Sequence, residues 1–162
     1  MIAANQIGGR TAAGTHEADS AAAAVMAVAM RKPALWPEVR HVRPEWLPEL
    51  ADRWLWQGLQ HTLEQNGGLV ELAVLEGWLL EHYPSDADAL LARLAEHCNT
   101  YLEFGTVERD VLILERHGLR RELRAFAQHI LELLDGDAPL NDIWATFADA
   151  PHPVRPEGGN DE

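Results

Sequence analysis

The chain has 162 residues, the length of one domain with a single sizeable core. Its balance of 47% hydrophobic and 24% charged residues excludes a collagen-like or wholly disordered protein. The formal net charge of −13 disfavours duplex nucleic acid as a partner, because binding to phosphates requires clustered cations. A single cysteine, Cys98, excludes an internal disulfide and a four-cysteine zinc site.

Residues 1–43 are predicted to be a flexible N-terminal extension that ends in a proline-rich linker. Residues 1–17 lack an apolar period, and Pro33, Pro37 and Pro44 forbid a continuous helix further along. The apolar run at residues 21–30 is interpreted as an alanine-rich helix or as part of a flexible extension. It is too short to cross a membrane, and acidic residues precede it where a signal peptide carries positive charge. We therefore expect no membrane contact and a cytoplasmic location.

Residues 44–149 are predicted to form an all-α domain, an up-and-down bundle of five to six helices. Apolar periodicity places these helices at about 45–65, 69–82, 86–104, 106–117, 119–134 and 140–149. Asn66-Gly67-Gly68 ends the first of them, and Gly118 separates the fourth from the fifth. Short connections between amphipathic helices favour antiparallel neighbours. Residues 150–162 are predicted to be a disordered acidic tail.

The segment 69–82 is apolar nearly all round, which is typical of a central buried helix. Glu71, Glu76 and Glu81 interrupt it, and their spacing of five points them in three directions. At least one of these carboxylates should be poorly solvated, and a buried carboxylate must be paired or protonated. We expect an arginine to pair with it.

The motifs of common enzyme classes are missing from the sequence. Cys98 lies on a predicted apolar stripe, where its thiol should be inert, and neither Ser20 nor Ser85 stands in a nucleophile elbow. The glycine pairs lack the lysine of a phosphate-binding loop. A site of paired carboxylates stays open. We predict a non-enzymatic protein without a cofactor.

The candidate binding residues are one tryptophan and four arginines. Trp56 falls on the polar side of the first predicted helix, where an exposed indole would anchor an interface unless the Trp36 segment folds over it. Residues 69–104 carry a net charge of −6, whereas residues 105–135 carry only −1. The candidate arginines lie in that less acidic stretch: Arg116, Arg120, Arg121 and Arg124.

Acidity and spare aromatic surface together favour a small accessory protein, such as an adaptor, an assembly chaperone or an inhibitor. Such a protein acts by binding another, larger protein, and charge can steer that encounter. Association into a homo-oligomer is compatible with the same features.

The second hypothesis is a metal- or haem-binding bundle with an oxygen-related role as sensor or enzyme. Residues 97–134 resemble the second half of hemerythrin-like bundles. The similarity lies in His97-Cys98-Asn99-Thr100-Tyr101, in Val107-Glu108-Arg109-Asp110-Val111-Leu112, and in Glu115-Arg116-His117-Gly118-Leu119 through to His129. The resemblance implies a di-iron site, for which His97, Glu108 and His129 are the candidate ligands.

The sequence departs from that family at its ligand motif. The family has a second histidine four residues after the first, and a glutamate four residues after that. Tyr101 and Gly105 occupy those positions here, and neither residue is a typical iron ligand of this family. Metal binding therefore stays the alternative function.

Overall fold

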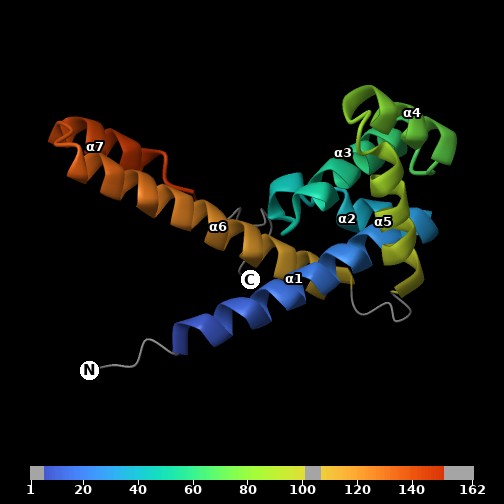
Figure 1. The fold of residues 1–162 in the computed structure, drawn as a ribbon, viewed down its shortest axis with the longest axis horizontal. Helices are drawn as coiled ribbons and strands as arrows, with labels where there is room; N and C mark the ends of the chain where they lie inside the picture. Colours follow the sequence, from blue (N-terminus) through green and yellow to red (C-terminus); the bar gives the residue numbers. More distant parts are fainter. Residues whose placement is uncertain (1–5, 101–106, 152–162) are drawn as a thin grey trace, which may run out of the picture. The chain divides into compact units, whose positions relative to one another are not determined.

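The computed structural model describes residues 6–100 and 107–151, with side chains described from His16 to Asn99 and from Val107 to Pro151 (Figure 1). All regular elements within these ranges are helices, so the predicted all-α class is confirmed. The end of the third predicted helix at 101–104, the residue Gly105 and the predicted tail at 152–162 lie outside them. Among the described helices, none is both long and apolar enough to span a bilayer.

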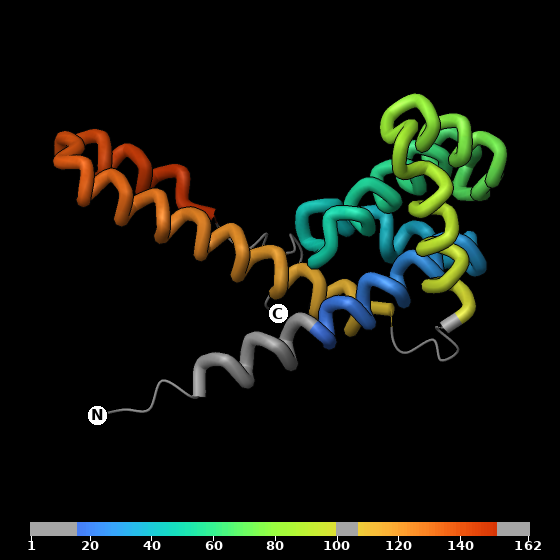
Figure 2. Tube along the Cα trace, in the orientation of Figure 1, coloured from blue at the N-terminus to red at the C-terminus, as the bar shows by residue number. Residues whose placement is uncertain are grey.

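The chain divides into two compact units, which we call the N-terminal unit (Met1–Gly118) and the C-terminal unit (Leu119–Glu162). The N-terminal unit holds α1, the short turns after it, α3, α4, α5 and the first part of α6. The C-terminal unit holds the rest of α6 together with α7. Figure 2 traces the described helices in chain order.

The N-terminal segment is part of the core, contrary to the prediction of a flexible extension. Residues Gln6–Arg31 form α1, and nine apolar side chains between Ala18 and Ala29 are buried. Helix α1 packs against α5, α3 and the short helices that follow it. Alanine contributes little apolar area by itself, but its small side chain lets neighbouring helices approach closely. The prediction for residues 1–43 is therefore wrong in its described part.

The proline-rich segment is also ordered by burial. It forms three short helices: η1 (Pro33–Leu35), α2 (Trp36–Val39) and η2 (Pro44–Trp46). Proline suits the first turn of a helix because its ring presets φ and no donor is lost there. Trp36, Val39 and Trp46 are all buried in the core of the unit.

Helices α3 (Leu50–Gln65), α4 (Leu72–His82) and α5 (Ala87–Thr100) lie within a few residues of their predicted limits. Gly67 and Gly68 adopt φ values of +62° and +91° directly after α3, so the predicted glycine turn is confirmed. Helix α3 packs on both α4 and α5. Helix α4 is less buried than predicted, because only its Leu75 and Leu79 side chains are fully enclosed.

Helix α6 (Val107–Asp135) is continuous where two helices were predicted. Gly118 does not end a helix; it lies within α6 against Trp46, and a Cβ atom there would be 2.7 Å from Cγ of the indole. Glycine at position 118 therefore leaves room for the side chain of Trp46. In the N-terminal unit, Val107, Val111 and Leu114 of α6 belong to the same core as Trp46.

The C-terminal unit is a helical hairpin. Helix α7 (Leu140–Ala148) runs back along the second part of α6 (Figure 1). Ile130 and Ile143 are buried, and the rings of Phe126 and Phe147 meet edge-on at 5.7 Å. A tight turn joins the helices, in which the Ala138 amide donates to the Leu133 carbonyl at 3.0 Å.

Candidate functional site

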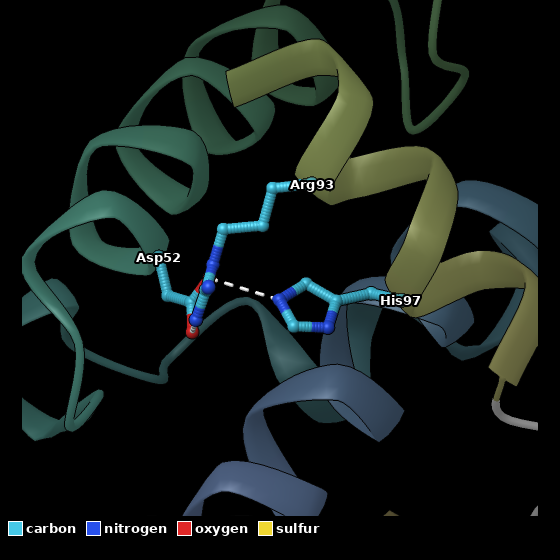
Figure 3. A network of polar contacts seen from close by, with 3 residues as sticks. All are labelled: Asp52, Arg93 and His97. Atoms are coloured by element: carbon cyan, nitrogen blue, oxygen red, sulfur yellow. Dashed lines mark hydrogen bonds and ion pairs between the residues drawn. The ribbon is translucent and has the colours of Figure 1, made fainter. Parts of the chain in front are cut away.

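The most strongly built polar site in the described part of the chain joins α3 to α5 (Figure 3). Asp52, in the first turn of α3, is 1% exposed. Arg93 of α5 donates from Nε and from one terminal nitrogen to the two Asp52 oxygens at 2.5 and 2.8 Å. One turn later, His97 Nε2 lies 2.9 Å from Asp52 Oδ1. We call these three residues the Asp52 triad.

The electrostatics of the triad keep Asp52 ionised. Burial by itself raises the pKa of the Asp52 carboxyl, but hydrogen bonds from Arg93 and His97 outweigh it and the pKa lies below its ordinary value. The hydrogen bond between Arg93 and Asp52 also raises the pKa of Arg93 above its usual value. The result is a charged clamp between two helices, in which a carboxylate receives a two-pronged guanidinium contact.

The triad offers little for acid–base chemistry, because both oxygens of Asp52 already accept hydrogen bonds. Cys98 is the neighbour of His97 in sequence, but burial raises the pKa of its thiol, with a smaller opposing effect of Arg31. A raised pKa lowers the thiolate fraction and with it the nucleophilicity of the sulfur. The triad is therefore best understood as a structural contact.

The buried acid is Asp52, whereas the sequence predicted a buried glutamate in the segment 69–82. Glu71, Glu76 and Glu81 are all exposed, so that expectation is wrong. A signal was present: Asp52 stands three, four and seven residues before Leu55, Trp56 and Leu59, all of which are buried. This spacing places the carboxylate on the buried stripe of α3. The buried acid that does pair with an arginine is Asp52, and its partner Arg93 lies on α5.

Two clefts lie beside α5. The first, of about 450 Å³, is lined by Trp54, by Arg93 of the triad and by two acidic residues, Asp86 and Glu96. The second, which we call the Leu72 cleft, has a volume of about 460 Å³. Apolar groups from α1, α4 and α5 dominate its lining: Met30, Leu72, Leu91, Leu94, Ala95 and Cys98. Glu76 and Asn99 are the polar residues that complete it.

Trp56, predicted as an exposed interface anchor, is fully buried. Its Nε1 donates to the Val42 carbonyl at 2.7 Å, and its ring lies 5.9 Å from that of Trp36. The segment that bears Trp36 folds over Trp56, which is the alternative to an exposed indole that the sequence left open. Trp56 is therefore a core residue, and its assignment to an interface is corrected.

The four candidate arginines lie on α6 and fall in both units. Arg116 is exposed in the N-terminal unit, whereas Arg120 and Arg124 are exposed in the C-terminal unit. Arg121, also in the C-terminal unit, is partly buried. Arg120 and Arg124 are one turn apart, on the outward side of the helix where the sequence placed them.

The candidate iron ligands are not gathered into a site. His97 is bound to Asp52, whereas Glu108 is exposed on the first turn of α6. His129 is exposed and belongs to the C-terminal unit. Within residues 6–100 and 107–151, no group of three His, Cys, Asp or Glu side chains is placed to hold a metal ion.

No protein-family model matches the sequence, and no significant match was found among curated proteins or among solved structures.

Proposed function

We propose that this chain is a non-enzymatic accessory protein that acts by binding another protein through the Leu72 cleft. The observation that carries the proposal is an open apolar cleft next to exposed apolar side chains. Leu72 lines the cleft and is 60% exposed, and Leu69, three residues earlier in the chain, is 58% exposed. Adjoining apolar groups on a surface are typical of protein-binding sites.

The open form of the cleft favours a protein segment over a small molecule. Sites for small ligands enclose most of the surface of the ligand. The Leu72 cleft is open along one side, and its apolar lining comes from three helices that together make a groove for an apolar helix face. Glu76 in the cleft, and the net charge of −6 over residues 69–104, favour a partner segment with basic residues.

The state of the neighbouring groups also favours binding over catalysis. The carboxylate of Asp52 is occupied by Arg93 and His97, and the pKa of the Cys98 thiol is raised by burial. The half-buried Cys98 is nevertheless useful, because it is the only cysteine in the chain and lines the cleft. It can report directly on whether the cleft is occupied.

The first experiment compares Leu72→Lys with a matched control, Leu112→Lys. Both leucines are about half exposed, but Leu112 lies on α6 and does not line the cleft. We expect the wild type and the control to capture the same protein from cells, and Leu72→Lys to lose it without a change in melting temperature. Equal capture by all three proteins would refute the cleft as the binding site.

The second experiment measures the reaction of Cys98 with a thiol reagent. A cationic amphipathic helical peptide should slow this reaction in a saturable manner, because the bound peptide covers the sulfur. An anionic peptide of the same apolar pattern should have a much weaker effect. If the captured protein or the cationic peptide binds while Cys98 reacts at its original rate, the occupied surface is a different one.

A further inference from the structure

The C-terminal hairpin exposes a set of large apolar side chains on both of its helices. Their exposed fractions range from 46% to 70%, with Leu140 and Trp144 the highest. We call this set the hairpin face: Leu123, Leu131 and Leu134 of α6, and Leu140, Trp144 and Phe147 of α7. Scattered surface leucines need no explanation, but six large apolar groups on a unit of two helices do.

The hairpin face is a single surface. On α6 its members are spaced by eight and three residues, and on α7 by four and three, so each set forms a stripe along its helix. At 100° per residue, the centre of each stripe lies about 50–70° from Ile130 or Ile143, the buried residues of the hairpin, in the same sense of rotation on both helices. Because the two helices run antiparallel, the same sense of rotation brings both stripes to one side of the hairpin.

A hairpin with one apolar face is half of a four-helix bundle. Each helix must bury its apolar stripe against another element, and two such hairpins can enclose a common core. We propose that the hairpin face binds the hairpin face of a second copy of this chain, so that a symmetric dimer forms through an antiparallel four-helix bundle.

The charged residues beside the α6 stripe favour a second copy of this chain as the partner that binds the hairpin face. Arg120, Arg124 and Asp135 lie on the outer flank of the α6 stripe, at intervals of four and eleven residues. If two α6 helices pair antiparallel with Gln128 near the midpoint, Arg120 and Arg124 of each copy approach Asp135 of the other. A two-fold axis repeats this contact, as at the flanking positions of coiled coils.

The rest of the hairpin shows the same polarity. Glu132, Asp137 and Asp142 lie near the turn, at the same end as Asp135, and give that end a net charge of −4. The opposite end holds three arginines and two acids, Glu122 and Asp149, and so has a net charge of +1. An antiparallel dimer therefore joins unlike charges at both ends, whereas a parallel one would join like charges. Dimerisation would also double the number of Leu72 clefts, but it does not depend on the proposed function of that cleft.

The first test measures the mass of the full-length chain in solution by analytical ultracentrifugation and native mass spectrometry. At about 50 μM we expect a dimer for the wild type and for Leu112→Lys, and a monomer with unchanged helicity for Leu131→Lys. A wild-type monomer at that concentration would overturn the proposal, and so would a dimer that persists in Leu131→Lys. Leu72→Lys should remain dimeric, which separates this test from that of the cleft.

The second test exchanges the charges. Arg120→Glu/Arg124→Glu should weaken self-association by about tenfold, because glutamates then face Asp135 of the second copy. Asp135→Arg should do the same by placing three cations together. A mixture of the two variants restores unlike charges at both contacts and should form a heterodimer of wild-type affinity. A mixture no tighter than either variant alone would exclude the antiparallel pairing.

Discussion

Gly118 on α6 lies directly against the indole ring of Trp46 on η2, and a Cβ atom at position 118 would overlap that ring. Alanine is better than glycine within a helix by about 1 kcal/mol, but overpacking a core costs about 1–3 kcal/mol. We expect Gly118→Ala to lower the free energy of unfolding by up to about 2 kcal/mol, which is the difference between these two effects. Urea unfolding followed by circular dichroism measures this change.

Gly77 provides the matched control for that substitution. It lies within α4, is exposed, and has no atom within 4 Å of the position that a Cβ would take. Gly77→Ala is therefore expected to raise the free energy of unfolding by about 0.5–1 kcal/mol. Stabilisation by both substitutions would show that Gly118 is not in contact with Trp46.

In the Asp52 triad, removing Arg93 and removing the charge of Asp52 should lower the free energy of unfolding by different amounts. Arg93→Ala leaves a carboxylate buried with His97 as its remaining partner, and we expect a loss of about 3–4 kcal/mol. Asp52→Asn leaves Arg93, which is 35% exposed and can turn to solvent, so we expect about 1–2 kcal/mol. Urea unfolding at pH 7 gives both values. Equal losses would contradict the buried position of Asp52.

The low pKa of Asp52 predicts how stability depends on pH. A carboxyl whose pKa is lower in the folded than in the unfolded state stabilises the fold above its ordinary value of 3.8. That contribution is lost as the pH falls from this value through the lower folded pKa. The stability difference between wild type and Asp52→Asn should therefore be smaller below about pH 4 than at pH 7. A difference that grows on acidification would mean that burial outweighs the hydrogen bonds.

The buried indole of Trp56 predicts two graded effects on stability. Trp56→Ala removes a large core side chain and should lower the free energy of unfolding by about 3–5 kcal/mol. Trp56→Phe should cost less, about 1–2 kcal/mol, because Gln60 also donates to the Val42 carbonyl and keeps it satisfied. Thermal unfolding followed by circular dichroism ranks the two. Loss of partner capture in Trp56→Ala with an unchanged melting temperature would restore its assignment to an interface.

Local patterns in the sequence were sufficient to predict most helices. The limits of α4 and α7, the start of α5 and the glycine turn after α3 follow from apolar periodicity and from the conformational freedom of glycine. Both signals arise within a few residues of chain, because helical hydrogen bonds and positive φ angles are local properties. The sequence pattern put Trp56 on the polar side of α3, whereas the buried side of α3 includes both Asp52 and Trp56.

The features that a single sequence did not reveal depend on contacts between distant residues. Helix α1 is stable because α5 and the proline-rich turns cover its small side chains. The helix α6 continues through Gly118 because Trp46, seventy-two positions earlier, occupies the space beside it. The sequence by itself determined that the chain is helical and where most helices lie. Only the tertiary structure decided which side chains are buried, because burial is a property of the partners that a helix finds.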